Sequence, residues 1–327
     1  MATITAHPKL DGQLKKPCGI SRQHLKIGGK MKYESIELTN ENNGHHVLFE
    51  SFVRDTGFLL QDFDPGVAPA SFKTAKGYGQ DGVTKYSAPL DIRNPRFTAS
   101  IIGNGLAEIE ILKQELDFVM NPKDTLTLKI NYETHGTHPE SKIIHGSPDQ
   151  SVDYSTNYKT SNDFLQEFKG GLECFDPYYT DPVDNRIALT SWEGGLSFPF
   201  TMPFTLAHRG APTVQVFNQG HVPAPVLIVF KGPAVYPKVE NLTTGQYVAV
   251  QKPLLEDETL YINTAYGQKS IEIEKNGVRS NGYNYIDLNS YLALTLAVGD
   301  NVLKYSSGRQ DLTNAVEVRF RRRFLGI

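Results

Sequence analysis

The sequence predicts a mainly β protein with two domains: an N-terminal β-sheet or sandwich domain that carries one α-helix, and a C-terminal antiparallel β-sandwich. Only one stretch, within residues 91–132, has the three- and four-residue apolar spacing of a long helix. The second half instead alternates short β-branched and aromatic runs with turns such as NQG, TTG and KNG. The 327 residues are also more than one hydrophobic core usually needs.

The predicted helix spans about residues 105–120. Its apolar residues recur at helical steps and predict one buried face: Leu106, Ile109, Leu112, Leu116 and Val119. Pro122 ends the helix, because proline cannot continue the hydrogen-bond ladder. Leu126, Leu128 and Ile130 then alternate with polar residues, which predicts a strand with one apolar side.

Changes in composition along the chain suggest the domain boundaries. We assign residues 1–148 to the N-terminal domain, 149–185 to a linker and connecting segment, and 186–327 to the sandwich. Residues 133–162 are almost devoid of paired apolar positions, which is typical of a linker or a surface insertion. Residues 1–30 are polar and rich in lysine and glycine, and we interpret them as an arm outside the core.

The overall charge and the cysteine count exclude several classes of protein. The formal charge is −3 and the pI is near 6.3, whereas nucleic-acid binding calls for a clustered basic excess. Cys18 and Cys174 are too few for a disulfide framework or a thiolate zinc site. The N-terminus lacks a signal-peptide core, and no run reaches the ~20 apolar residues of a membrane span. We therefore expect a soluble protein that is made in the cytoplasm.

The sequence contains no HExxH, no GxSxG, no P-loop, and no GxGxxG between a strand and a helix. We therefore predict no catalytic residue, no cofactor-binding residue and no metal ligand. His135, His138 and His145 are close enough in sequence to suggest a metal site. We interpret them as solvated loop residues, because metal ligands must be held in place by neighbouring groups.

Aspartates cluster beside prolines in two loops. Asp176, Asp181 and Asp184 could supply the two carboxylates that glycoside cleavage needs at a defined separation. Asp62 and Asp64 suggest calcium, although the EF-hand spacing is absent. Aspartate beside proline or asparagine is also favoured in turns, through its own hydrogen bonds to the backbone. We interpret both groups as turn residues.

The last strand has one apolar and one charged side. Three apolar residues alternate with three charged ones: Val316, Val318 and Phe320 with Glu317, Arg319 and Arg321. We favour a half-exposed strand with a solvated basic side over an interface for an acidic partner, because charge runs usually stay hydrated. We assign this strand to the C-terminal sandwich.

Several longer segments occur in a characteristic order. The first half holds KYESIELTNENNG, TGFLLQDFDPG, and NPRFTASIIGNG leading into LKQELDFVMNPKDTLTLKI. The second half holds LECFDPYYTDP, LSFPFTMPF, VQVFNQGHVPAPVLIVFKGPAVYPKVENLTTGQYVAV and the terminal AVEVRFRRRFLGI. In this order the segments resemble the distal tail protein (Dit) family of long-tailed bacteriophages and related prophages. The resemblance extends from about Lys32 to Ile327.

The resemblance implies a structural role in the virion and no enzymatic activity. It implies that the N-terminal domain forms a ring, usually of six copies, at the distal end of the tail, and that a galectin-like sandwich is attached outside. The implied partners are the major tail tube protein, the tail-tip hub, the tape-measure protein, and a receptor-binding protein or a host surface glycan. DNA would pass through the ring only in transit. Synthesis would take place in the host bacterial cytoplasm, and no cofactor and no membrane insertion are implied.

A ring of identical copies also needs a surface through which each copy can join the next. Sheet edges carry unpaired amides and carbonyls and can join copies into rings. We predict that strands within Tyr33–Leu60 and Thr125–Tyr132 form such edges, and that Lys73, Lys76 and Lys85 face the lumen or the next ring. A Leu128→Pro substitution is then expected to remove a ladder hydrogen bond and abolish ring assembly.

Two other functions are kept as alternatives. One is a galectin-like carbohydrate-binding module that contacts the host cell, favoured by the sandwich and by 16 Tyr, 17 Phe and 1 Trp. Glycan-array binding by residues 186–327 would support it. The other is a surface glycoside hydrolase with carboxylates at Asp176 and Asp181. Unchanged function after replacing both with asparagine would remove it.

Overall fold

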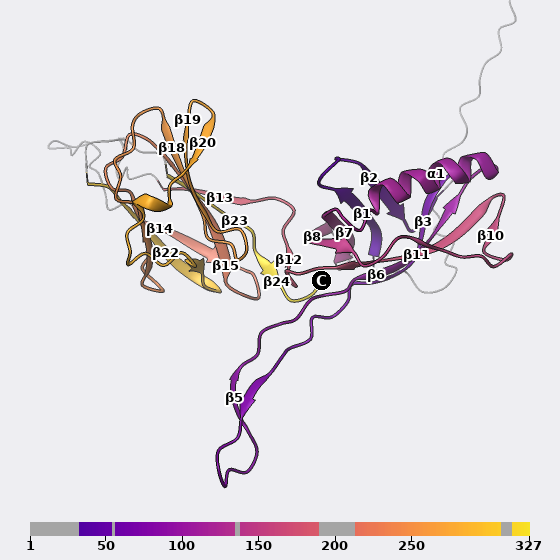
Figure 1. Ribbon diagram of the computed structural model, residues 1–327, viewed down its shortest axis with the longest axis horizontal. Coiled ribbons are helices and arrows are strands. Elements are labelled where there is room, and N and C mark those ends of the chain that lie inside the picture. The colour runs from indigo at the N-terminus through magenta and orange to yellow at the C-terminus, as the bar shows by residue number, and fades with distance from the viewer. Residues whose placement is uncertain (1–32, 54–55, 135–137, 190–212, 309–315) are drawn as a thin grey trace, which may run out of the picture. The chain divides into compact units, whose positions relative to one another are not determined.

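The computed structural model describes residues 33–53, 56–134, 138–189, 213–308 and 316–327. The first part of the chain builds a large sheet and packs one helix on it (Figure 1). Its elements are β1 (Tyr33–Asn40), β2 (His46–Glu50), β3 (Gly57–Asp64), β6 (Arg96–Ile102), α1 (Leu106–Val119), β7 (Leu126–Thr134), β8 (His138–Pro148), β9 (Asp153–Tyr154), β10 (Ser161–Asn162), β11 (Leu165–Glu173) and β12 (Tyr179–Thr180). The prediction of a mainly β chain with one long helix is confirmed.

The large sheet has eleven strands and closes on itself. Its order is β10-β11-β6-β3-β2-β1-β7-β8-β12-β24, with β9 paired to β11, and β24 (Arg323–Phe324) comes from the end of the chain. Because β11 pairs with both β6 and β8, the strands β11, β6, β3, β2, β1, β7 and β8 form a barrel. The predicted apolar side of β7 lies in the barrel core, since Leu126, Leu128 and Ile130 are fully buried.

Helix α1 agrees with the predicted span of about 105–120. Ile109, Leu116 and Val119 are buried, and Leu112 is half-buried. Leu106, which the sequence pattern places on the same side, is exposed. Leu106 opens the first turn, directly after Gly105, and lies beyond the packed part of the helix. The Glu108 carboxylate accepts a hydrogen bond from the Asn104 amide, which satisfies a donor at the helix start.

The polar stretch 133–162 is not a linker, so that prediction is wrong. Its residues 138–148 form β8, which pairs with β7 from Leu126↔Gly146 to Thr134↔His138. Ile143 and Ile144 give this strand its buried residues. The segment 149–185 likewise contributes strands β9 to β12 to the large sheet. β8 can be largely polar because successive side chains point to opposite faces of a strand, and only those that face the barrel core need to be apolar. The division into domains at 148 and 185 itself stays a prediction.

The expected sheet edges are also wrong. β1 pairs with β2 on one side and with β7 on the other, and β7 pairs with β1 and β8. β3 lies between β2 and β6. Strands that have neighbours on both sides cannot add another copy by backbone pairing. Any contact between copies through these strands would have to use side chains.

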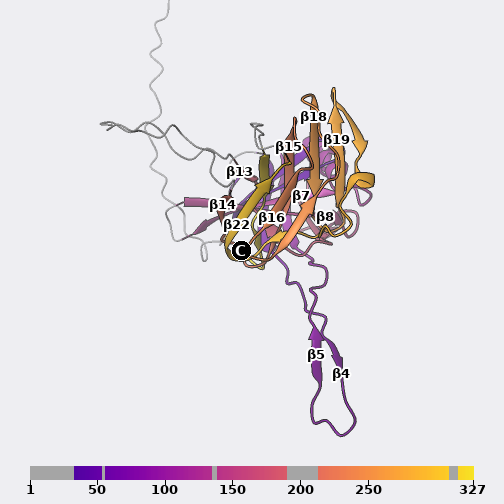
Figure 2. The same cartoon turned by 90° about the vertical axis from the view of Figure 1, so that its left-hand side faces the viewer.

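A long hairpin leaves the barrel between β3 and β6. It contains β4 (Lys73–Ala75) and β5 (Thr84–Ser87), which pair only with each other. The two views show it standing away from the rest of the described chain (Figures 1 and 2). The three lysines predicted to face the lumen or the next ring all lie on it and are exposed: Lys73, Lys76 and Lys85.

The second part of the chain forms two sheets around one core, as a β-sandwich does. A seven-stranded sheet has the order β13-β23-β15-β18-β19-β20, with β21 paired to β15, and a four-stranded sheet has the order β14-β22-β16-β17. The strands are β13 (Asn185–Leu189), β14 (Thr213–Asn218), β15 (Ala224–Lys231), β16 (Lys238–Asn241), β17 (Gln246–Ala249), β18 (Glu258–Asn263), β19 (Ser270–Lys275), β20 (Val278–Asn281), β21 (Thr295–Leu296), β22 (Gly299–Ser306) and β23 (Val316–Phe320). The shared core includes Phe230 and Val318 from one sheet and Leu303 from the other. No helix in the described part of the chain is long and apolar enough to span a membrane.

The last strand lies where the sequence predicts it. β23 pairs with β13 and β15 inside the sandwich, and Val316, Val318 and Phe320 are buried. Only three residues later, β24 pairs with β12 in the large sheet. The end of the chain therefore crosses from the sandwich to the barrel sheet within a few residues.

Candidate functional site

Ion pairs join residues 321–323, where the chain passes from the sandwich to the barrel sheet, to the 176–184 loop. We call this set of ion pairs the clasp. Three consecutive arginines follow β23, and each pairs with a different aspartate of the loop. The pairs are Arg321 Nε to Asp184 Oδ1 at 2.6 Å, Arg322 Nε to Asp181 Oδ2 at 2.6 Å, and Arg323 Nη2 to Asp176 Oδ1 at 2.5 Å. The two segments that link the barrel sheet to the sandwich are thus tied to each other, in antiparallel order.

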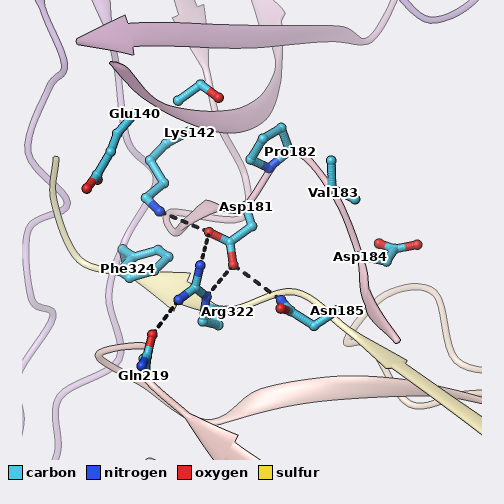
Figure 3. A pocket seen from close by; sticks show the side chains of 11 residues that line it. Glu140, Lys142, Asp181, Pro182, Val183, Asp184, Asn185, Gln219, Arg322 and Phe324 are labelled. Atoms are coloured by element: carbon cyan, nitrogen blue, oxygen red, sulfur yellow. Dashed lines mark hydrogen bonds and ion pairs between the residues drawn. The ribbon is translucent and has the colours of Figure 1, made fainter. Parts of the chain in front are cut away.

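Asp181 is the centre of the clasp. Its carboxylate also accepts a hydrogen bond of 2.9 Å from Lys142 Nζ on β8, and only 8% of its side chain is exposed. Arg322 contributes a second contact through Nη2 at 3.3 Å and donates from Nη1 to Gln219 Oε1 at 2.7 Å. Lys142 Nζ lies 3.9 Å from the centre of the Phe324 ring. Figure 3 shows Lys142 and Arg322 pointing toward Asp181. The three residues line an open hollow of about 580 Å³.

The surroundings of Asp181 keep it ionised. Burial raises the pKa of this carboxyl, but hydrogen bonds from Arg322 and Lys142 lower it by more, so the net pKa is below the usual value. A general acid of a glycoside hydrolase needs the opposite, a raised pKa and access to the substrate. The geometry therefore gives Asp181 a structural role.

Asp181 should make stability depend on pH in acid. A group whose pKa is lowered by folding stabilises the protein fully above its unfolded pKa, about 3.9 for aspartate, and loses this effect as the pH falls through the folded pKa. We expect the urea midpoint of the protein to exceed that of an Asp181→Asn variant at pH 7, and the difference to shrink below about pH 4. Because other carboxyls titrate in both proteins alike, the difference isolates Asp181. A difference that is constant from pH 7 to pH 2.5 would contradict this assignment.

Arg93 ties the same region to the root of the β4–β5 hairpin. It is 3% exposed and donates to three backbone carbonyls: Gly66 O at 2.8 Å, Pro177 O at 2.8 Å and Leu325 O at 2.6 Å. Its guanidinium also stacks on the Tyr179 ring at 4.7 Å. One side chain thus joins the hairpin root, the 176–184 loop and the end of the chain. Arginine suits this position because its fork offers several donors in a fixed plane.

We expect Arg93→Met to lower the free energy of unfolding by about 2–4 kcal/mol, since three carbonyls lose their donor while a buried charge is removed. Urea unfolding measures this loss. Arg96→Met is a matched control on the next strand, because the Arg96 side chain is 65% exposed and its ion pair with Asp149 is 3.3 Å long. Equal effects of the two substitutions would contradict a special role for Arg93.

The charged residues of the clasp have roles that differ from those predicted from the sequence. The aspartates at 176, 181 and 184 are more than turn residues, although Asp176 also accepts a 3.4 Å bond from the Tyr178 amide. The basic end of the chain is not simply solvated, and its acidic partner lies in the same chain. Arg319 is paired with Glu317 at 2.8 Å on its own strand. The sequence gives only a weak indication of this pairing, namely three aspartates in one segment and three arginines in another, because the two segments lie about 140 residues apart.

The other candidate residues do not form a site. His135 lies outside the described residues, and His138 begins β8. His145 Nδ1 is 2.6 Å from the Glu41 carboxylate. Asp64 accepts a hydrogen bond from the Gly66 amide at 2.9 Å, as predicted for a turn. No group of three or more metal-ligating side chains occurs among the residues that the structure describes.

Comparison with known proteins agrees with this architecture. Residues 219–324 match the family model of the siphovirus-type tail component, C-terminal domain. The fold is similar to the crystal structure of the SPP1 Dit protein, a paradigm of the hub adsorption apparatus in phages that infect Gram-positive bacteria: the TM-score is 0.59, with 13% identity over 88% of this chain and 99% of that chain. A chain of the phage P2 baseplate in its activated conformation with Ca has a TM-score of 0.52, with 11% identity over 89% of this chain and 98% of that chain. A search of curated proteins found no match.

The structural likeness confirms one prediction from the sequence, the Dit-like fold. At such low identity the structural likeness shows a shared fold, and the family model matches residues 219–324 alone. Residues 219–324 are thus similar to the C-terminal domain of a siphovirus-type tail component, and the described chain has a fold similar to that of a distal tail protein.

Proposed function

We propose that this protein forms a closed ring, of six copies, at the distal end of a phage tail. The barrel would make the ring, the sandwich would lie on the outside, and the lumen would let DNA pass. The ring would join the major tail tube protein to the tail-tip hub and to the adhesion proteins, with the tape-measure protein inside. What supports the proposal is the Dit-like fold together with the match of residues 219–324 to the siphovirus-type tail component family model.

The observation that carries the proposal is the hairpin. Both of its strands are exposed along their whole length, and so are its aromatic residues Phe72, Tyr78 and Tyr86. A two-stranded ribbon without a core is marginally stable in water, and exposed apolar patches of this kind mark interaction sites. Contact between copies would cover these side chains.

The clasp gives the sandwich a fixed mount on such a ring. Two chain segments, 174–185 and 320–325, cross between the barrel sheet and the sandwich, and ion pairs hold them together. Two connections resist rotation better than one, because a single linker can turn about its own bonds. An adhesion protein bound to the sandwich would then keep its orientation relative to the tail axis.

The proposal is tested by the mass and symmetry of the purified full-length protein. Light scattering should give a discrete oligomer, and negative-stain images should show closed rings with a central hole. The truncation that removes residues 71–89 and joins Ala70 to Leu90, which are paired across the hairpin, with a short glycine linker is expected to remain monomeric. A monomer at every protein concentration and salt concentration for the intact chain would end the proposal.

A further inference from the structure

A hollow of about 590 Å³ lies at the C-terminal end of α1. Its lining includes Asp117 and Phe118 from the last turn, Asn121 and Asp124 from the following loop, and Val152 and Tyr154 around β9. It is separate from the hollow beside Asp181, whose lining comes mainly from β8, the 176–184 loop and the end of the chain.

Among the described residues that line it, the hollow has two carboxylates, Asp117 and Asp124, and no lysine or arginine. The Asp117 carboxylate accepts a hydrogen bond from Tyr154 OH at 2.9 Å, and Asp124 accepts from the side-chain amides of Asn40 at 2.9 Å and Asn42 at 2.6 Å. Within the described part of the chain no ion pair is recorded for either aspartate, and the last turn of α1 holds no basic residue. The end of a helix adds negative partial charge at this point. The aspartates of the clasp differ, because arginines already neutralise them.

Phe118 lines the same hollow, and Ile111 lies further along the helix. Ile111 and Phe118, which are seven residues apart on α1, are 65% and 56% exposed. Residues at this spacing lie on one side of a helix. The outer side of α1 therefore presents an apolar stripe that ends at an acidic hollow. A suitable partner would carry aromatic or aliphatic groups together with positive charge.

The β4–β5 hairpin has this complementary chemistry. It exposes Phe72, Tyr78 and Tyr86, and it carries three lysines against one aspartate, Asp81, between residues 67 and 90. With about 13 residues in each arm, it can reach roughly 40 Å from the barrel. Figure 1 shows the hairpin and α1 on opposite sides of the barrel, so the two cannot meet within one copy.

We propose that the β4–β5 hairpin of one copy docks on the acidic hollow and the apolar stripe of α1 in the neighbouring copy. Its lysines then face Asp117 and Asp124, and its aromatic rings cover Phe118 and Ile111. The contact is heterologous, because a donor hairpin meets an acceptor helix, and such contacts generate closed rings or stacked assemblies. The inference rests on the proposed ring-forming function and names the surfaces that build it.

The contact is large enough to matter. Each of the three aromatic rings can bury about 150–250 Å², while a specific interface buries about 800 Å² per partner. The rings alone would supply more than half of that area. The lysine stems and the backbone of the hairpin would add the rest.

Charge reversal and its compensation test the pairing. In one variant Lys73, Lys76 and Lys85 become glutamate, in a second Asp117 and Asp124 become lysine, and a third variant combines all five changes. We expect each of the first two to weaken assembly by on the order of 100-fold in light scattering, because like charges then face each other, and the combined variant to recover. Lys169→Glu, an exposed lysine on β11, is the control and should assemble normally. Circular dichroism verifies that every variant is folded.

A cross-link gives an answer even if a reversal damages the fold. In a Cys18→Ser background, Tyr78→Cys at the hairpin tip and Ser151→Cys beside the hollow should form a disulfide ladder between copies on mild oxidation. A Tyr78→Cys and Thr213→Cys pair, with the second cysteine on the sandwich, should not. Rings that persist in both reversal variants, or form without the Tyr78–Ser151 cross-link, would overturn the docking inference and leave the ring intact. Absence of any oligomer in the unmodified protein would instead end the ring proposal.

Discussion

Leu128→Pro is expected to leave the barrel unfolded, with no ring and no stable monomer. Leu128 is fully buried in β7, between Leu38 on β1 and Ile144 on β8. Proline removes a ladder hydrogen bond, worth about 1–3 kcal/mol when its partner is left buried and unpaired. Loss of the Leu128 side chain from the core costs about another 2–5 kcal/mol. Together these reach the 5–15 kcal/mol by which a whole domain is usually stable.

Two measurements separate loss of folding from loss of assembly. Leu128→Ala keeps the backbone amide and loses only packing, so it should remain folded with a lower urea midpoint and should still assemble. Far-UV circular dichroism of the proline variant should show lost strand content. A proline variant that is folded but monomeric would mean that β7 acts at an edge after all, contrary to its pairing with β1 and β8.

Asp181→Ala is expected to destabilise the protein by about 3–5 kcal/mol, the range seen when one partner of a buried ion pair is removed. Lys142, whose side chain is 11% exposed, and Arg322 would then be left with uncompensated charge. Limited proteolysis should detect cleavage in the 176–184 loop and near residue 321, because these segments would no longer be held together. Urea unfolding gives the magnitude.

The clasp also allows a sharper control. Asp176→Ala removes an aspartate of the same loop that is 58% exposed, and we expect a change of about 0–1 kcal/mol. Replacing Asp181, Lys142 and Arg322 together by leucine and methionine should recover most of the stability, because a fully apolar cluster leaves no buried charge unpaired. A triple variant as unstable as Asp181→Ala would argue that the ion pairs themselves, more than the avoidance of an unpaired charge, stabilise the junction.

Local pattern was enough to predict much of the fold. The spacing of Ile109, Leu116 and Val119 predicts α1, and the alternation of Val316, Val318 and Phe320 predicts β23. Both patterns depend on one element burying one side, which is a property of neighbouring residues. The prediction failed for β8, because that strand has few apolar residues and is held by pairing to β7. Pairing partners are not visible in the composition of a single segment.

The sequence by itself determined a mainly β chain, the one long helix, the place of the last strand, and an order of segments that resembles distal tail proteins. Only the tertiary structure decided which charges meet. Asp176, Asp181 and Asp184 resemble turn residues or catalytic carboxylates when read alone, and they become structural once three arginines from the end of the chain reach them. The reason is that an ion pair depends on distance in space, and residues about 140 positions apart come within hydrogen-bonding range only when barrel and sandwich have both formed.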